Sequence, residues 1–346
     1  MNLRSLVRDN IWNLAPYSSA RSEFTGEASV FLDANENPLN TPYNRYPDPL
    51  QAALKERISD MRGVPADQIF LGVGSDECID LAYRIFCEPG VDNVVAIAPT
   101  YGMYRVCADV NDVEYRAVEL GDNFTLDAGA LLAAADGHTK LMWICSPNNP
   151  TGNAFDTAAI AALCRSFGGI VMVDEAYVEF SERGSMLPML AQIPNIIVMQ
   201  TFSKAWGSAA VRLGMAFASR DIIALYNKVK YPYNVNLLTQ KYALGMLDRV
   251  GEVADWVSTL LSNRSELAGE LKTMRCVHRV FATDANFLLT RVDDADALYA
   301  YLRDRGIIVR NRSRVEKCAG CLRITVGTSS ENEELIKAIK DYELKR

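Results

Sequence analysis

The sequence has little of what nucleic-acid-binding, membrane and secreted proteins need. Its 346 residues carry 36 Lys and Arg against 43 Asp and Glu, a net charge of −7, and the basic residues are scattered. Binding to a phosphate backbone requires a clustered basic surface, so no nucleic-acid partner is expected. No apolar run approaches the roughly 18 residues that span a membrane, and the N-terminus, MNLRSLVRDNIWNLAPY, lacks the continuous apolar segment of a signal peptide. These absences predict a cytoplasmic protein without a membrane partner.

Histidine is also scarce, with only His138 and His278 in the whole chain. The eight cysteines are dispersed, and several lie in apolar surroundings such as LMWIC (141–145), as reduced core thiols do. Cys318 and Cys321 form a single CxxC with no second pair, far in sequence from either histidine. We favour a loop cysteine followed by one that enters a strand over a metal or redox site, and expect neither disulfides nor a metal.

Short apolar runs alternate with longer amphipathic stretches from about residue 65 onward. The runs are VVAIA (94–98), LMWIC (141–145), IVMVD (170–174), IIVMQ (196–200) and GMAFA (214–218). Such runs are typical of strands buried on both faces of a mostly parallel sheet. Helical segments are expected between them, for example over 127–135 and 156–167, so the predicted class is α/β.

The pattern changes after residues 231–233. A long helix is expected over 240–272, a further helix near 294–305 and a last one from Glu331, with strands at NFLLT (286–290), GIIVR (306–310) and LRITVG (322–327). This α+β pattern predicts a second, smaller domain. We place a large domain at 37–232, and group an N-terminal arm, 1–36, with the small C-terminal domain, 233–346.

Distinctive polar groups follow several of these strands at their carboxyl ends, where open α/β sheets bind ligands. In LGVGSDECIDL (71–81), Ser75 and Asp76 open an amphipathic helix. Free N–H groups at a helix N-terminus, together with a serine hydroxyl, can hold a phosphate. Ser and Asp are also ordinary N-caps, and that alternative stays open.

The next two strands end in an amide-rich turn and in a carboxylate. CSPNNPTGN (145–153) is a rigid turn that can present an asparagine amide to a ligand, or be a turn and nothing more. In VMVDEAYVEF (171–180), Asp174 ends a buried run and Tyr177 follows three residues later. A carboxylate there needs a cation or a donor opposite it, as a ligand or as part of a structural salt bridge or helix cap.

Lys204 follows the buried run IIVMQTFS and has small or aromatic neighbours. Most lysines are solvated surface residues, but an amine held in such surroundings can have a pKa low enough to attack a carbonyl and form a Schiff base. Arg212, eight residues later, could neutralise a phosphate. A phosphate site, an amide, a carboxylate, a tyrosine and an amine together fit pyridoxal 5′-phosphate.

The motifs of this chain resemble those of fold-type I pyridoxal-phosphate aminotransferases, and more narrowly those of histidinol-phosphate aminotransferases. The stretches are LDANENP (32–38), RYPDP (45–49), GVGSDE (72–77), APTYGMY (98–104), SPNNPTG (146–152), DEAY (174–177), TFSKAW (201–206) with Arg212, and LRITVGT (322–328). The resemblance extends from Tyr17 to Thr328, nearly the whole chain.

This resemblance implies a role for each matching residue. Lys204 would form the Schiff base with the cofactor and shuttle the proton, and Asp174 would pair with the pyridinium nitrogen. Asn149 and Tyr177 would hydrogen-bond the ring oxygen O3′, and Tyr101 would stack on the ring. The residues implied to surround the cofactor phosphate are Ser75, Asp76, Thr201, Ser203, Arg212 and, from a partner subunit, Tyr46. The last residue implies a homodimer with shared active sites.

The resemblance also implies the substrates, L-histidinol phosphate and the glutamate/2-oxoglutarate pair of histidine biosynthesis. Arg323 would bind the substrate phosphate, helped by Arg310 and Tyr17, and would bind the α-carboxylate of glutamate in the other half-reaction. Arg310 and Arg312 could instead be charges of a solvated loop, and Tyr17 a packing residue.

Three alternative functions remain at this stage. A threonine-phosphate decarboxylase and an aromatic-amino-acid aminotransferase share the cofactor apparatus of this fold. A non-catalytic binding protein could also keep the fold, although a binding module has no need of a carbonyl-reactive lysine.

Overall fold

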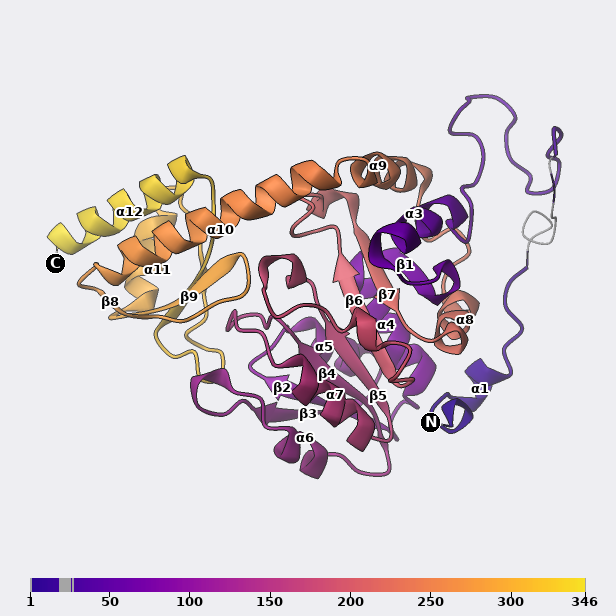
Figure 1. Ribbon diagram of the computed structural model, residues 1–346, viewed down its shortest axis with the longest axis horizontal. Coiled ribbons are helices and arrows are strands. Elements are labelled where there is room, and N and C mark those ends of the chain that lie inside the picture. Colours follow the sequence, from indigo (N-terminus) through magenta and orange to yellow (C-terminus); the bar gives the residue numbers. More distant parts are fainter. Residues whose placement is uncertain (1, 19–25, 27, 346) are drawn as a thin grey trace.

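The computed structural model describes residues 2–18, 26 and 28–345, and the larger part of these is built on a seven-stranded mixed sheet (Figure 1). The strands are β1 (Ile69–Val73), β2 (Asn93–Ala98), β3 (Glu114–Glu119), β4 (Thr139–Cys145), β5 (Ile170–Asp174), β6 (Ile196–Thr201) and β7 (Leu213–Phe217), in the order β1-β7-β6-β5-β4-β2-β3. Neighbours from β3 to β6 are parallel, whereas β7 is antiparallel to both β6 and β1. Every apolar run predicted as a strand lies in this sheet, so the predicted α/β class is confirmed.

Helices cover both faces of this sheet, which explains why its central strands are apolar on both sides. In β5, Val171 and Val173 face one apolar cluster, while Ile170 and Met172 face the other. The first cluster includes residues of α3 (Ala52–Arg62), α6 (Ala128–Ala134) and α7 (Thr157–Ser166). The second includes residues of α1 (Asp9–Trp12), α4 (Gly74–Phe86), α5 (Met103–Val110) and α8 (Arg220–Val229). Each strand therefore contributes alternate residues to two cores.

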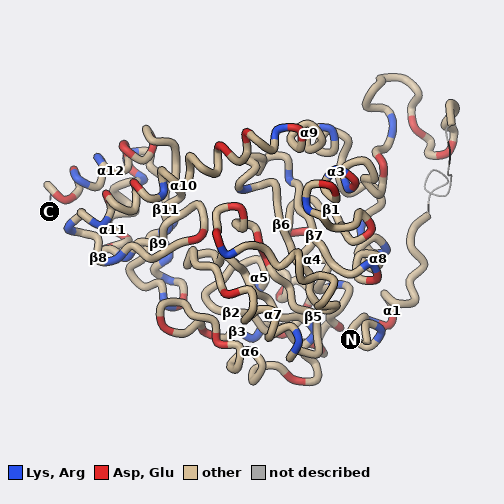
Figure 2. Tube along the Cα trace, in the orientation of Figure 1, with Lys and Arg blue, Asp and Glu red and all other residues tan. Residues whose placement is uncertain are grey.

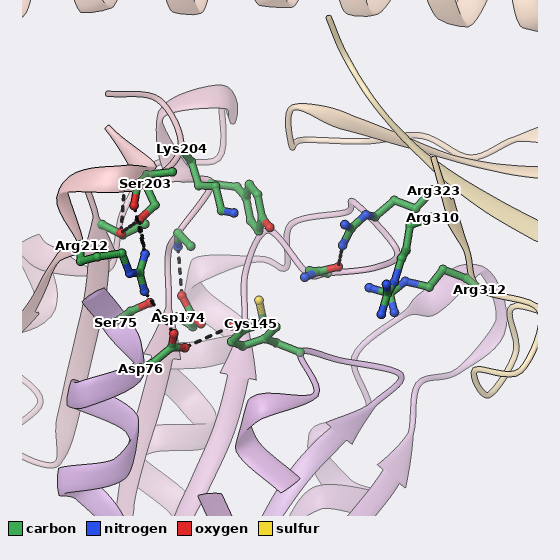
Figure 3. A pocket seen from close by; sticks show the side chains of 16 residues that line it. Ser75, Asp76, Cys145, Asp174, Ser203, Lys204, Arg212, Arg310, Arg312 and Arg323 are labelled. Carbon is green, nitrogen blue, oxygen red and sulfur yellow. Dashed lines mark hydrogen bonds and ion pairs between the residues drawn. The ribbon is translucent and has the colours of Figure 1, made fainter. Parts of the chain in front are cut away.

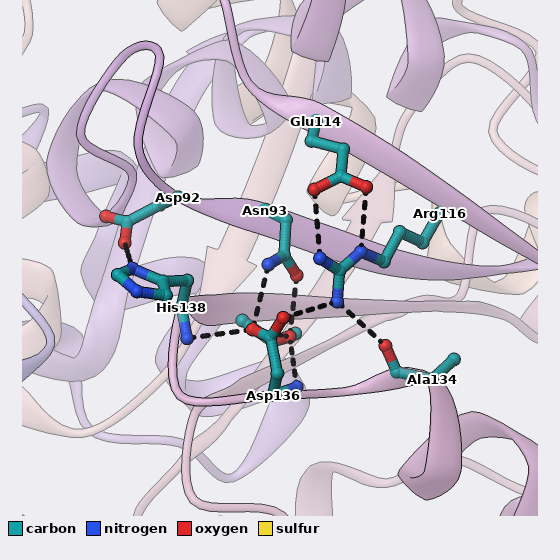
Figure 4. A network of polar contacts seen from close by, with 8 residues as sticks. Asp92, Asn93, Glu114, Arg116, Ala134, Asp136 and His138 are labelled. Carbon is teal, nitrogen blue, oxygen red and sulfur yellow. Dashed lines mark hydrogen bonds and ion pairs between the residues drawn. The ribbon is translucent and has the colours of Figure 1, made fainter.

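A polar network joins the amino ends of three parallel strands (Figure 4). Asn93, Glu114 and Thr139 are the first residues of β2, β3 and β4, and they are register partners. Arg116 donates to both carboxylate oxygens of Glu114 at 2.9 Å and to Asp136 Oδ2 at 2.7 Å. Hydrogen bonds from Asn93 and Arg116 hold the pKa of the Asp136 carboxyl well below its usual range. These groups satisfy one another's hydrogen-bonding requirements at the amino ends of the strands. The carboxyl ends, at the opposite edge of the sheet, remain for a ligand.

The second part of the chain carries a four-stranded antiparallel sheet within the described residues, with the order β10-β11-β9-β8. Its elements are α9 (Leu237–Leu247), α10 (Val250–Lys272), β8 (Val277–Val280), β9 (Phe287–Val292), α11 (Ala295–Arg303), β10 (Arg310–Asn311), β11 (Cys321–Thr325) and α12 (Ser329–Leu344). Figure 1 shows α10 running from the large sheet to the small one. The predicted grouping of 1–36 with 233–346 stays a prediction, although Val7 and Ile11 pack into the cluster that contains α4 and α8.

Two elements of this part differ from the sequence prediction. The single helix expected over 240–272 is two helices, because Arg249 leaves the helical conformation and becomes the N-cap residue of α10. Asp248, just before the break, is ion-paired to Arg57 of α3 at 2.6 Å. The expected strand at 306–310 is reduced to its last residue. Gly306 has a φ of +77°, and the Ile307 N–H donates to Leu302 O at 3.0 Å, so this segment closes α11 instead of joining the sheet.

The connection between β5 and β6 also lacks the helix that a strand-helix-strand unit between Asp174 and Lys204 would require. It contains only short 3₁₀ turns, at Val178–Phe180 and Leu187–Met189. Buried Glu175 organises it by accepting hydrogen bonds from Met186 N and Ser185 Oγ at 2.6 Å and from Gln200 Nε2 at 2.9 Å. Hydrogen bonds to the Glu175 carboxylate, and not a helix, therefore hold this loop against the sheet.

Within the described ranges no helix is long and apolar enough to cross a membrane. Figure 2 shows acidic and basic residues interspersed along both parts of the chain. All eight cysteines are free thiols in buried positions.

Glu175 gives the first testable prediction. Burial raises the pKa of its carboxyl from 4.5 to about 7, so the folded state binds this proton more tightly than the unfolded state does. The contribution of Glu175 to stability is therefore largest at acidic pH and decreases as the pH rises from about 4.5 to about 7. Glu175→Gln cannot ionise, so the unfolding free energy of the wild type relative to the variant should fall by roughly 2 to 3 kcal/mol across this range.

Denaturant unfolding of both proteins at about pH 5 and about pH 8 measures this difference. The exposed Glu334→Gln serves as the control and should show no such trend. A wild-type-to-variant difference that is the same at both pH values would contradict the assignment.

Candidate active site

A cavity of about 400 Å³ opens at the carboxyl ends of the central strands, between the two sheets. Cys145, Asp174 and Thr201, the last residues of β4, β5 and β6, all line it. The small sheet contributes Arg310 of β10 and Arg323 of β11 from the other side (Figure 3). The cavity therefore has a floor made by one sheet and a wall made by the other.

All but two of the residues selected from the sequence line this cavity. The residues that line it are Ser75, Asp76, Tyr101, Asn149, Asp174, Tyr177, Thr201, Ser203, Lys204, Arg212, Arg310 and Arg323. Tyr17 and Tyr46 do not line it and are 73% and 51% exposed, and Tyr46 stacks on Tyr233 of its own chain at 4.4 Å. The structure places these residues, and their individual roles remain predictions.

One end of the cavity combines a helix N-terminus with a guanidinium. Arg212 donates to Asp76 Oδ2 at 3.3 Å and to Ser203 Oγ at 3.4 Å, and Tyr101 donates to Asp76 Oδ1 at 3.1 Å. Neither Ser75 nor Asp76 caps α4, because both lie inside its first turn and Val73 is the N-cap residue. The Ser75 hydroxyl and the free N–H groups at the start of the helix are therefore available to an anion.

Two glycines permit the close approach of chain segments at this end. Gly74 has a φ of +72°, and a Cβ there would lie 2.5 Å from Arg212 Nη2. A Cβ on Gly214 would collide with the backbone of Gly74 and Ser75. Because neither residue can carry a side chain, β7 and α4 pack backbone to backbone and bring Arg212 beside the helix N-terminus.

Asp174 lies deep in the cavity, and Tyr104 holds it there. Asp174 Oδ2 accepts from Tyr104 Oη at 2.7 Å and Oδ1 accepts from Ala176 N at 3.1 Å. Burial raises the pKa of the Asp174 carboxyl, and the Tyr104 hydrogen bond opposes the shift. No ion pair to Asp174 occurs among the described residues, so it is not part of a structural salt bridge. A protonated ligand group placed opposite this carboxyl would favour its charged form.

Sequence reasoning assigned no role to Tyr104. Its ring is fully buried and stacks on Trp143 at 4.6 Å, with its hydroxyl directed at Asp174. Tyr101 precedes α5 and Tyr104 is the second residue of that helix, and their rings make an edge contact at 5.6 Å. No periodicity in the sequence identifies Tyr104 as a partner of Asp174.

The amine of Lys204 lies 5.6 Å from the centre of the Tyr177 ring, beside the cavity. The residue reaches solvent through the cavity mouth, yet burial lowers the pKa of its amine, with a further contribution from Arg323. Asp174 and Asp76 raise it in part. A larger share of this amine is therefore neutral, and nucleophilic, than of an exposed lysine at the same pH.

The two asparagines of the turn at 145–153 differ: one is held inside the fold and the other lines the cavity. Asn148 is fully buried and is held by Pro99 O, Thr151 Oγ1 and Thr100 Oγ1 at 2.8 to 2.9 Å. Asn149 instead lines the cavity, where its Oδ1 accepts from Arg323 Nη1 at 2.6 Å. The turn therefore both presents an amide to a ligand and carries its own structural asparagine.

The sequence model of the family described as aminotransferase class I and II matches residues 24–339. The chain is 56% identical to a histidinol-phosphate aminotransferase of Parabacteroides distasonis over 99% of both sequences. The histidinol-phosphate aminotransferase of Clostridium acetobutylicum has a similar structure, with a TM-score of 0.82, 21% identity, and 88% of this chain and 92% of that chain covered. The enzyme of Sinorhizobium meliloti, solved with pyridoxal 5′-phosphate, gives a TM-score of 0.78 at 21% identity, with 86% and 84% covered. At 21% identity, these two solved structures show that the chain has the same fold.

The lowered pKa of Lys204 can be measured without any cofactor. Reductive methylation of the cofactor-free protein with ¹³C-formaldehyde gives each lysine an NMR signal that titrates with its amine. The Lys204 signal should titrate at lower pH than those of exposed lysines, because burial and Arg323 disfavour its charged form.

The variant Lys204→Arg should remove this signal, and the exposed Lys241→Arg should leave it. These variants are needed because burial also lowers the pKa of Lys55 and Lys230 to about 8. A Lys204 signal that titrates together with the exposed lysines would refute the expected activation.

Proposed function

The chain belongs to the aminotransferase class I and II family, and we propose that it transfers an amino group between L-histidinol phosphate and 2-oxoglutarate in histidine biosynthesis. The observation that carries this proposal is 56% identity over 99% of the chain to a histidinol-phosphate aminotransferase. The cavity supports it, because one amine, one buried carboxylate and several arginines meet there. We expect the enzyme to work in the cytoplasm, as the composition predicts.

The cofactor is pyridoxal 5′-phosphate, and the cavity fits it. Asp174 is buried without a cationic partner among the described residues, as a carboxylate that meets a pyridinium nitrogen must be. Arg212 and the N-terminus of α4 form an anion site at the other end. When bound, pyridoxal phosphate supplies an aldehyde that takes up the amino group and a ring that accepts electrons from the reacting carbon.

The phosphate of the cofactor would be held by Arg212 and by the hydroxyls around it. Thr201 Oγ1 donates to Ser203 Oγ at 3.0 Å, which places two hydroxyls side by side near the guanidinium. Ser75 adds a hydroxyl and a backbone N–H at the helix start. Asp76 orients Arg212 through its carboxylate.

Asp174 would keep the ring nitrogen protonated, which strengthens the electron-withdrawing character of the ring. Tyr104 fixes one carboxylate oxygen and thereby sets the direction in which the carboxylate meets the ring. Asn149 and Tyr177 would bind the oxygen O3′, and Tyr101 would cover one face of the ring.

Lys204 would move the proton between the Cα of the substrate and the C4′ carbon of the cofactor. An amine must be neutral to accept this proton, and the lowered pKa of Lys204 favours that state. Arg323, with Arg310 and Tyr17, would bind the phosphate of histidinol phosphate, and Arg323 would bind the α-carboxylate of glutamate in the second half-reaction.

The absorption spectrum of the purified enzyme tests the substrate. Without a keto acid, histidinol phosphate should bleach the band of the aldehyde form faster than histidinol, threonine phosphate or phenylalanine, and 2-oxoglutarate should restore it. Equal rates with phenylalanine would favour an aromatic-amino-acid aminotransferase, and release of CO₂ from threonine phosphate a decarboxylase. Lys204→Ala should abolish the bleaching, and a variant that stays active would refute the enzymatic proposal.

We also propose a homodimer in which the segment around Tyr46 completes the neighbouring site. The end of the arm and the segment that follows it expose large apolar side chains, among them Leu32 at 91% exposure and Leu39 at 71%. Val73 and Tyr242 line a second cavity of about 470 Å³ that includes Arg212, and both are exposed. A second copy that buries these apolar groups could bring its Tyr46 to Arg212 and the phosphate.

Subunit complementation tests the shared site. Tyr46→Ala should weaken cofactor binding about tenfold or more, because a hydrogen bond to a charged group is lost. Lys204→Ala and Tyr46→Ala, co-expressed with different tags, should form a heterodimer with one intact site and regain activity. Each variant alone is the control. The assay is run at a cofactor concentration that leaves the Tyr46→Ala homodimer largely empty. A heterodimer no more active than the two homodimers under that condition, or an active monomer, would contradict the shared site.

A further inference from the structure

A third arginine, Arg312, lines the cavity beside the two that the sequence predicts for substrate binding (Figure 3). Arg310 and Arg323 are register partners in the β10–β11 ladder, and the Arg312 N–H extends the ladder by donating to Cys321 O at 2.9 Å. Successive side chains of an extended strand point to opposite faces, so residues 310 and 312 share the face that carries Arg323.

Asn311 confirms this alternation. Its side chain reaches the other face, where Nδ2 donates to Asp296 Oδ1 of α11 at 2.6 Å. Figure 3 shows the guanidinium groups of Arg310 and Arg312 directed to the same region of the cavity. Three guanidinium groups are therefore gathered on one side of the cavity.

These guanidinium groups have few partners in the protein. Within the described residues, none of the three forms an ion pair with a carboxylate, and the only side-chain acceptor bonded to any of them is Asn149 Oδ1, bound by Arg323. The Nε atoms of Arg312 and Arg323 are buried and have no hydrogen-bond partner. A buried N–H donor without an acceptor lowers the stability of the fold, and an anion bound in this part of the cavity would supply the acceptors.

Arg312 is more enclosed than Arg310. Arg310 is exposed, whereas Arg312 is half-buried, and burial, followed by the charges of Arg323 and Arg310, lowers the pKa of its guanidinium. The two arginines that share an enclosed space are thus Arg312 and Arg323. The interpretation of Arg312 as a solvated loop charge fits Arg314 instead, which is exposed and does not line the cavity.

We propose that Arg312 is a specificity-determining residue that binds the phosphate of the substrate together with Arg323 and Arg310. This inference rests on the proposed function. A carboxylate offers two oxygens and one negative charge, which one guanidinium fork satisfies. A phosphate monoester offers three terminal oxygens and a charge near −2, which match several guanidinium groups. Arg312 makes the cavity select a phosphate ester over an uncharged alcohol.

Two substrates that differ only in the phosphate isolate this contribution. In single-turnover half-reactions, Arg312→Gln should raise the dissociation constant of histidinol phosphate about tenfold or more and leave the maximal rate within about twofold. The reaction with histidinol, which has no phosphate, should be unchanged. Arg312→Lys should recover part of the affinity, because it keeps the charge but loses the planar fork.

The matched control is Arg314→Gln, which makes the same charge change in the same loop and should have no effect on either substrate. A similar loss with both substrates would assign Arg312 a structural role and overturn the proposal, as would an Arg312→Gln enzyme that keeps the wild-type affinity for histidinol phosphate.

Inhibition by inorganic phosphate separates this inference from the proposed function. If the wild type does not prefer histidinol phosphate, the proposed function fails on its own. Phosphate should still compete with amine substrates in the wild type and about tenfold more weakly in Arg312→Gln. Equal inhibition of both proteins by phosphate would overturn the role of Arg312 whatever the substrate is.

Discussion

The buried carboxylate of Asp174 is the constraint on which the rest of the cavity depends. It ends a central strand at the floor of the cavity, and burial raises its pKa. Tyr104 and the Ala176 N–H stabilise it without supplying a positive charge. On the proposed function, the protonated ring nitrogen of the cofactor supplies that charge. Binding of the cofactor would therefore offset the desolvation free energy that folding imposes on the Asp174 carboxylate.

The residues proposed to hold the cofactor and the arginines proposed to bind the substrate belong to different sheets. Asp174, Lys204 and Arg212 belong to the large sheet or the loops that leave it, where Gly74 and Gly214 fix the backbone spacing. The arginines of β10 and β11 belong to the small sheet. A movement of one sheet relative to the other would change the substrate end and leave the cofactor end intact. On the proposed roles, this division would let the large sheet keep the chemistry constant while the small sheet sets the specificity.

The sequence predicts most of the large sheet and most of the cavity, since both follow from apolar runs that end in polar groups. It does not predict features that depend on contacts between distant segments. The helix expected over 240–272 breaks at Arg249, where the chain lies beside α3, and the loss of the strand at 306–310 results from a turn that closes α11. Tyr104 could not be assigned because its partner lies 70 residues away in sequence. Tyr17 and Tyr46 follow only from the family resemblance, because neither reaches the cavity of its own chain.

The proposed role of Arg312 illustrates how a residue beside a very short strand can escape prediction. β10 has only two residues, too few for any period in hydrophobicity to be recognised. Once its pairing with β11 is known, however, the alternation of side chains places Arg312 on the face of Arg323. The guanidinium group then enters the cavity without a contact that the fold itself requires, since its side chain forms no hydrogen bond within the described chain. A residue that forms no side-chain hydrogen bond within the described chain can change without loss of the fold, so on the proposed role position 312, directly after β10, is where the anion preference of the cavity would be altered.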